Sequence, residues 1–208
     1  MYHNWKRLLA LLLLIFAVAG NAHSANILGV RWLFQNMELL PDDFAGNSPK
    51  MTVSPYLGGY LRSGEFLYIG TAYNNIKSDF DAGGEITGRI IQPYAGIRYY
   101  IGPRNKRDVT PYIGAEFYKS FTSLKNDADS VYNSEDVQFL EKLYAPWGFA
   151  FSVGADYGAA DALYFGMEAG LQWAFSKPEA QGGSIYGNLK QDRRDIRLYT
   201  LIHIDFLW

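Results

Sequence analysis

The chain has 208 residues, including 16 Tyr, 13 Phe and 5 Trp, and is too aromatic and too weakly charged for a disordered protein. Its 19 basic and 21 acidic residues give no positive excess, so we expect no nucleic-acid partner. The absence of Cys excludes a disulfide scaffold, thiol catalysis and Cys-ligated zinc, and the three His leave little for a His-rich metal site. We therefore expect no metal and no cofactor.

Residues 1–25 have the pattern of a cleaved signal peptide. Lys6 and Arg7 form a positive start, and the apolar run 8–20 is long enough for a signal core but short for a membrane span. The alternative is an uncleaved anchor. Cleavage is expected after one of three small residues: Ala22, Ser24 or Ala25. The remaining residues, 26–208, hold no second long apolar run and are predicted to form one domain.

Alternation of apolar with small or polar residues is the main secondary-structure signal. In the segment 147–157, Trp, Phe, Phe, Val, Ala and Tyr occupy the odd positions, and Gly, Ala, Ser, Gly and Asp the even ones. Side chains alternate between the faces of a strand, so this pattern predicts a strand with one apolar face. Eight segments follow it: 28–35, 51–62, 66–74, 91–101, 111–118, 147–157, 163–175 and 196–208.

The connections between these segments alternate between long and short. They are expected at 36–50, 63–64, 75–87, 102–108, 122–145, 158–161 and 176–193. Outer-membrane barrels have short periplasmic turns and long extracellular loops, whereas a soluble sandwich has no reason for such alternation. The sequence therefore predicts an all-β fold: an eight-stranded antiparallel up-and-down transmembrane β-barrel. A secreted soluble β-protein is the alternative.

A Pro-Tyr-x-Gly core recurs in three of the predicted strands. It occurs at 55–58, 93–96 and 111–114. Proline cannot donate to a strand ladder, so the strands that contain Pro55 and Pro93 are expected to start late or to carry a bulge. The glycine that follows leaves room for a large inward neighbour.

Aromatic residues on the apolar face gather near strand ends. Indole and phenol rings favour the headgroup level of a bilayer, so these residues are predicted to form an aromatic girdle. A buried sandwich core is the alternative. The predicted girdle contains Trp32, Trp147, Trp173, Phe206 and Trp208.

The alternating segment 198–208, which ends in Trp208, resembles the assembly signal of Gram-negative outer-membrane proteins. The glycine-rich strands resemble the small outer-membrane β-barrel superfamily, which includes opacity-type proteins and the OmpA and OmpX barrels. The resemblance covers the predicted mature chain. It implies an outer-membrane location, contact with lipids and lipopolysaccharide, and recognition of the C-terminal strand by the barrel-assembly machinery. The family includes adhesins, envelope-stabilising barrels and narrow channels, so it does not define an activity.

Charged residues on the opposite strand face are expected to point into the lumen. An eight-stranded barrel is only wide enough for side chains to fill it, and buried charges must pair. We predict a lumen ion-pair network that plugs the barrel, and the protein is then a structural or surface-interaction protein that presents its loops. A narrow pore for ions or small solutes is the alternative. The network is assigned to Arg31, Arg98, Glu116, Asp156, Glu168, Arg197, His203 and Asp205, with Arg62 on the same face.

A lipid A-modifying enzyme is a further alternative, because Ser152, His203, Asp156 and Asp205 point inward in the same part of the barrel. A Ser-His-Asp set needs these groups within hydrogen-bond reach. A lipid substrate enters from the outer leaflet, whereas these residues are predicted deep inside. We therefore expect no enzyme and assign no catalytic residue.

The predicted outer loops carry most of the remaining charge. Carboxylates gather in the first three loops, which are taken as solvated rather than as a calcium site because the spacing of an EF-hand is absent. Any surface ligand would meet these loops. The last loop is basic and could meet lipopolysaccharide phosphates through Lys177, Lys190, Arg193 and Arg194.

Two shorter features complete the prediction. The segment 134–144 has a capping Ser134, acidic residues in its first turn and an apolar face of Val137, Leu140 and Tyr144, which predicts a short helix rather than a disordered tip. The basic turn 104–107 is predicted to lie on the periplasmic side as a solvated turn.

Overall fold

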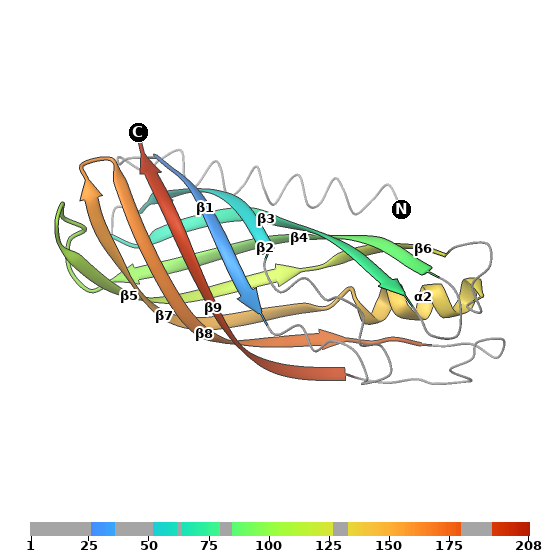
Figure 1. The fold of residues 1–208 in the computed structure, drawn as a ribbon. Helices are drawn as coiled ribbons and strands as arrows, with labels where there is room; N and C mark the ends of the chain where they lie inside the picture. Colours follow the sequence, from blue (N-terminus) through green and yellow to red (C-terminus); the bar gives the residue numbers. More distant parts are fainter. Residues whose placement is uncertain (1–25, 36–51, 62–63, 80–84, 127–132, 180–192) are drawn as a thin grey trace.

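A computed structural model describes residues 26–35, 52–61, 64–79, 85–126, 133–179 and 193–208 (Figure 1). The predicted signal segment 1–25 lies outside the described residues. The elements are β1 (Asn26–Gln35), β2 (Thr52–Tyr60), β3 (Phe66–Asp79), β4 (Glu85–Tyr100), β5 (Val109–Lys119), β6 (Phe121–Asn126), α2 (Ser134–Leu143), β7 (Trp147–Ala160), β8 (Leu163–Ser176) and β9 (Arg193–Leu207). In the described part of the chain, no helix has the length and apolar character needed to cross a bilayer.

The strands form one closed antiparallel sheet. Consecutive strands pair from β1 to β5 and from β7 to β9, β5 pairs with β7, and β1 closes the barrel by pairing with β9. β5 and β6 both pair with β4 and occupy one position in the barrel, so the sheet has eight barrel strands. The predicted eight-stranded antiparallel barrel is confirmed. We call the end at 61–65, 101–108 and 161–162 the turn end, and the opposite end, which carries α2, the loop end.

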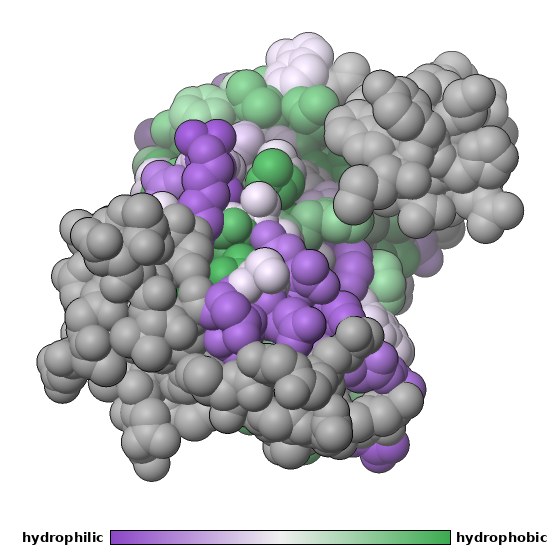
Figure 2. All heavy atoms as spheres, turned by 90° about the vertical axis from the view of Figure 1, so that its right-hand side faces the viewer, coloured by the Kyte–Doolittle hydropathy of each residue, from purple (hydrophilic) through white to green (hydrophobic). Residues whose placement is uncertain are grey.

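The two faces of the sheet differ as the alternation predicts. In β2, Thr52, Ser54 and Tyr56 are buried in the lumen, whereas Val53 and Leu57 are exposed on the outside. The same phase holds in every barrel strand, so large apolar side chains cover the exterior. A closed sheet with this exterior is the kind of β-structure that can span a bilayer. Seen from the loop end, hydrophilic side chains gather at the centre of the described surface (Figure 2).

Two predicted connections are wrong because strands continue through them. β3 runs to Asp79 and β4 begins at Glu85, so the expected connection 75–87 shrinks to 80–84. The expected connection 122–145 contains most of β6 and all of α2. With their extensions, β3 and β4 pair over 14 register positions in all. The strict alternation of long and short connections is therefore not observed.

The expectation for the proline-containing strands is also wrong. β2 and β4 start early, at Thr52 and Glu85, and the register continues without a shift past Pro55 and Pro93. Pro55 adjoins the last pair between β2 and β3, and Pro93 lies where β4 changes partner from β6 to β5. Each proline thus occupies a position where one ladder stops, so its missing N–H does not break a hydrogen bond.

Side chains bridge the seam where β2 and β3 separate. Their ladder ends at the pair Tyr56–Gly70, although both strands continue toward the loop end. Beyond that pair, Thr52 Oγ1 donates to Asn74 Oδ1 at 2.9 Å, and Ser54 Oγ donates to the carbonyl of Thr71 at 3.0 Å. The wall is closed here by buried side chains in place of backbone bonds.

The helix α2 takes the place beside β6 that β7 takes beside β5. The backbone N–H of Leu124 donates to Glu141 Oε1 at 2.8 Å, and Thr122 Oγ1 donates to the carbonyl of Tyr144 at 2.6 Å. A short helix over 134–144 is confirmed, with Leu140 and Tyr144 buried. The predicted cap is wrong: Asn133, not Ser134, forms the capping box, because its side chain accepts from Glu135 and Asp136. The helix covers a strand edge that would otherwise be unpaired.

Glycines make room for the tyrosines that fill the lumen. A Cβ added at any of these glycines would lie under 3.0 Å from the ring on the directly paired strand. The glycine–tyrosine pairs are Gly29–Tyr56, Gly96–Tyr68, Gly70–Tyr94, Gly154–Tyr112, Gly148–Tyr118 and Gly170–Tyr199. For the glycine of the Pro-Tyr-x-Gly core, the prediction is confirmed at Gly58, which faces Phe66, and at Gly96, which faces Tyr68, but it is wrong at Gly114, which faces the small Ser152 side chain.

Substitution of Gly154 by alanine is expected to destabilise the barrel by about 1–3 kcal/mol, the usual cost of overpacking. Its Cβ would lie 2.4 Å from the Tyr112 ring and 2.7 Å from the carbonyl oxygen of Met167, and the backbone oxygen cannot move freely. The matched control is Gly59→Ala, because a Cβ at Gly59 meets nothing within 4 Å. Urea unfolding in detergent micelles measures both, and equal midpoints for the two variants would contradict the expectation.

Candidate functional site in the lumen

The barrel brings most of the predicted lumen charges together. Arg31, Arg98, Asp156, Glu168, His203 and Asp205 are buried, and the Glu116 side chain is 11% exposed. They come from six barrel strands, and each faces inward because it occupies the phase opposite the apolar exterior. Arg62 lies outside the described residues. The contacts divide into three levels along the barrel, taken here from the turn end.

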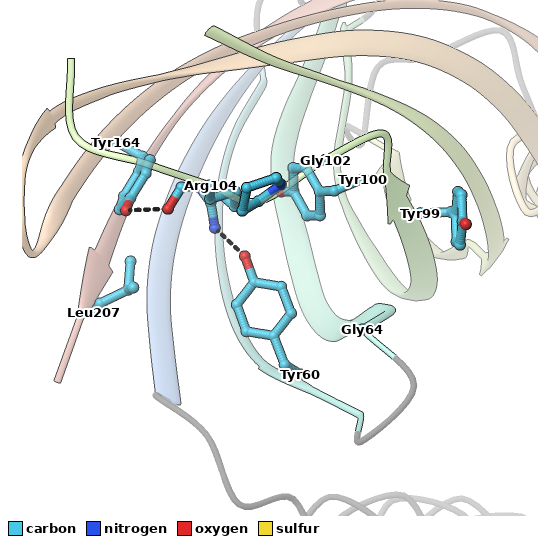
Figure 3. Close-up of a pocket in the computed structure, with 9 residues that line it drawn as sticks. Tyr60, Gly64, Tyr99, Tyr100, Gly102, Arg104, Tyr164 and Leu207 are labelled. Carbon is cyan, nitrogen blue, oxygen red and sulfur yellow. Dashed lines mark hydrogen bonds between the residues drawn. The ribbon is translucent and has the colours of Figure 1, made fainter. Parts of the chain in front are cut away.

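At the turn end, two carboxylates share one arginine. Arg104 Nη2 lies 2.6 Å from Asp156 Oδ2 and 2.8 Å from Asp205 Oδ2, and its side chain is only 5% exposed. Arg104 Nη1 donates to Tyr60 Oη at 2.7 Å, and Tyr164 donates to the Arg104 carbonyl (Figure 3). The predicted solvated turn 104–107 is therefore wrong at Arg104, whose side chain enters the lumen.

The surroundings of Arg104 favour its charge. Burial alone would lower its pKa, but Tyr100, Asp156 and Asp205 outweigh burial and raise the pKa above its ordinary value. The guanidinium carbon also lies 4.1 Å from the centre of the Tyr164 ring. Arg104 is thus a permanent cation that offsets part of the negative charge of the two carboxylates at the floor of the lumen.

In the middle level, Arg98 is the centre of the network. It is fully buried, and its Nη2 lies 3.5 Å from Glu168 Oε2. Glu168 in turn accepts hydrogen bonds from Tyr112 at 3.0 Å and from Tyr199 at 2.8 Å. His203 lies beside both levels: its Nε2 is 3.3 Å from Arg98 Nη1 and 2.9 Å from Asp156 Oδ1. The middle and lower levels therefore form one connected network.

Nearer the loop end, Arg31 and Glu116 form a bidentate pair. Tyr68 donates to Glu116 at 3.2 Å, and the Arg31 guanidinium lies 3.4 Å from the centre of the Tyr94 ring. Tyr94 shares a hydrogen bond of 2.6 Å with Ser54 on β2. This level therefore joins the pair to the bridged seam between β2 and β3.

Arg197 is the predicted network residue whose expected partner is wrong. It was expected to face Glu116, Glu168, Asp156 or Asp205, but its Nη2 lies 2.8 Å from Asp195 Oδ2, two residues earlier on β9. The pair lies beyond Tyr199, in a part of β9 whose partner among the described residues is β8. The alternation places Arg197 on the inward face of β9, where it pairs with the nearby carboxylate of Asp195.

Tyrosines are the lumen residues that sequence reasoning missed. Counting charges alone omits the hydroxyl groups that supply most hydrogen bonds to the buried carboxylates. Tyr100 donates to Asp156 at 2.8 Å, and Tyr56 donates to Asp205. The signal in the sequence is the repeated glycine, which lies opposite most of the inward tyrosines but not opposite Tyr100. The buried lumen tyrosines are Tyr56, Tyr68, Tyr94, Tyr100, Tyr112, Tyr118, Tyr164 and Tyr199.

The hydrolase alternative lacks its central contact among the described residues. Ser152 interacts with the Tyr199 hydroxyl, whereas His203 contacts Asp156 and Arg98. Asp156, His203 and Asp205 have ligand atoms within 4.8 Å of one another and could in principle reach one metal ion. Arg104, however, already lies between the two carboxylates. The chain supplies its own cation to this cluster.

The residues assigned to the girdle lie on the exterior. Trp147, Phe206 and Trp208 are exposed, and Trp32 and Trp173 are half-buried, so none points into the lumen. Trp147 stacks on Phe175 with ring centres 4.7 Å apart, and Trp173 stacks on Phe149 at 5.2 Å. Membership of a membrane girdle remains a prediction. The location of these rings contradicts the dry-core alternative.

No protein-family model and no curated protein matches the sequence. Several solved structures are similar in fold, among them three outer-membrane proteins. Outer membrane protein W of E. coli has a TM-score of 0.59 and 14% identity, over 90% of this chain and 100% of that one. OprG of Pseudomonas aeruginosa has a TM-score of 0.53 and 15% identity, over 90% of this chain and 98% of that one. The outer membrane protein AlkL, solved in lipid bilayers, has a TM-score of 0.50 and 13% identity, over 91% of this chain and 92% of that one. The chain has the fold of a small outer-membrane β-barrel. The prediction that the chain resembles small outer-membrane barrels is thus confirmed for its fold.

Proposed function

We propose that the protein is an outer-membrane barrel whose lumen is closed by its own side chains and which acts at the cell surface through its loops. The observation that carries the proposal is the network of arginines, carboxylates and tyrosines that crosses the lumen at three levels. A barrel of this width leaves little space for water once these side chains are in place. The loop end then faces the medium, and the turn end faces the periplasm.

This function assigns partners by location. The apolar exterior contacts membrane lipids, the outer loops are available to a surface ligand, and β9 is the strand that the barrel-assembly machinery would recognise. The closed lumen gives the protein a structural or surface-interaction role and argues against the narrow pore. Catalysis is not needed to explain any of the described contacts.

Planar-bilayer recording tests the closed lumen. The refolded protein is expected to add no steady conductance to a membrane, because each level is held by buried ion pairs. Insertion is verified by heat-modifiable migration of the recovered protein, in which the folded form runs faster than the boiled one. A porin inserted into the same membrane shows that an open channel would be seen. A steady conductance from the folded protein would establish the pore and remove the plug.

A further inference from the structure

A basic pocket lies between α2 and the junction of β5 and β6. It has a volume of about 280 Å³. The pocket is lined by Lys119, Ser120, Phe121, Thr122, Gln138, Glu141, Lys142 and Ala145. Lys119 Nζ donates to the carbonyl of Ala145 at 2.7 Å, which turns this lysine toward the helix. Lys142 is exposed on α2, so two ammonium groups border one cavity.

The outward columns of three neighbouring strands change from apolar to basic near this pocket. Toward the loop end, Ile91 on β4 is followed by Arg89, and Phe117 on β5 is followed by Lys119. On β6, Phe121 is followed by Ser123 and then by Lys125. Ile91 and Phe121 are directly paired, so two of the changes occur side by side. Such a change marks the level at which hydrocarbon gives way to headgroups, where long basic side chains extend to phosphates.

The second pair of cations is close enough to act together. Arg89 pairs with Ser123, so Lys125 is its diagonal neighbour across β4 and β6. Diagonal neighbours on one face lie about 7–8 Å apart, within the reach of two long side chains to one phosphate. Glu141, the acid in the pocket wall, accepts from the Leu124 N–H. Among the ion pairs between described residues, none includes Arg89, Lys119, Lys125 or Lys142.

We propose that this face, made of Arg89, Lys119, Lys125 and Lys142, binds the phosphates of an anionic glycolipid of the outer leaflet. One phosphate occupies the pocket between Lys119 and Lys142, and the acyl chains run down the wall over Phe121 and Phe117. The argument depends on the proposed function in one respect: the loop end must be the outer end. This site differs from the last basic loop, to which sequence reasoning assigned the lipopolysaccharide contacts.

Native mass spectrometry of the folded protein in detergent tests the site. The probes are a bis-phosphorylated lipid A and the same lipid without its phosphates. The double variant Lys119→Gln/Lys142→Gln is expected to bind the phosphorylated lipid about tenfold more weakly or worse, since each hydrogen bond to a charged group contributes substantially to binding. Binding of the dephosphorylated lipid is expected to stay unchanged. The matched control, Lys106→Gln/Arg107→Gln, removes two basic residues at the turn end and is expected to bind like the wild type.

Each further outcome decides the proposal. If the first variant fails the heat-modifiability test for folding, Arg89→Gln/Lys125→Gln on the strand surface replaces it with the same expectation. If the variant loses affinity for both lipids equally, or if the turn-end control loses as much affinity as the variant, the proposed site is wrong. Inorganic phosphate that displaces the lipid at equal concentration would identify an anion site rather than a lipid site. A conducting barrel would contradict the closed lumen but would not change the lipid-binding result. Failure of the proposed function and failure of the lipid site can therefore be told apart.

Discussion

Replacing Arg104 by alanine is expected to lower the free energy of unfolding by about 3–5 kcal/mol, the cost of removing one partner from a buried ion pair. Asp156 and Asp205 would keep hydrogen bonds from Tyr100 and Tyr56, but they would lose the guanidinium that lies between them. Their side chains are 0% exposed, so water cannot replace it at low cost. Urea unfolding in micelles, followed by the gel shift, measures the effect.

The space left by the Arg104 side chain provides a second measurement. It is bounded by two carboxylates and by the rings of Tyr100 and Tyr164, a combination suited to a planar cation. Millimolar methylguanidinium is therefore expected to raise the unfolding temperature of the alanine variant and to leave the wild type unchanged. Tetramethylammonium at the same concentration controls for ionic strength, because it cannot donate hydrogen bonds.

A neighbouring residue separates this effect from general loss of charge in the turn. Lys106 lies two residues away, and its ion pair with Asp161 is exposed. Lys106→Ala is expected to change stability by at most about 1 kcal/mol, as is usual for surface pairs. An Arg104→Ala protein as stable as the wild type, or one rescued equally by both cations, would show that Arg104 does not hold the floor of the lumen.

The spanning part of the fold could be predicted because a bilayer imposes a strict rule on each residue. In β7, every odd residue from Trp147 to Tyr157 faces the exterior of the barrel, and every even one faces the lumen. The rule ends with the membrane. Beyond it, the polar residues Thr87 and Arg89 stand on the outward face of β4, so the alternation is lost and the sequence predicts a connection where β3 and β4 continue as strands. The ladder itself, which does not depend on side-chain polarity, continues there.

The sequence predicts which charged residues face the lumen, but it does not predict which of them pair with each other. Phase alone places Arg98 and Glu168 inside, yet which carboxylate each arginine meets depends on shear and on side-chain length. Arg104 was missed for a different reason: it lies in a turn, where alternation carries no information. Its inward course is fixed by contacts distant in sequence, among them the bond of 2.6 Å from the Arg107 N–H to the Gly158 carbonyl.

The pair of Arg31 and Glu116 provides the second large effect. Arg31→Met alone leaves the Glu116 carboxylate in a lumen where the Glu116 side chain is only 11% exposed, and is expected to cost about 3–5 kcal/mol. Glu116→Leu alone is expected to cost a similar amount, because Arg31 is 3% exposed and would then be a buried unpaired cation. Both values come from urea unfolding of the refolded variants.

The double variant Arg31→Met/Glu116→Leu is expected to be close to wild-type stability, since a buried ion pair can often be replaced by apolar residues of similar size. The exposed pair of Lys106 and Asp161 gives the matched cycle, with an expected coupling of at most about 1 kcal/mol. If the two lumen substitutions instead add, the charges do not compensate each other. The plug would then be held by the tyrosine packing over glycine rather than by the ion pairs. A double variant that is stable and still closed in planar bilayers would show that closure needs filled volume and satisfied charge, and not this particular pair.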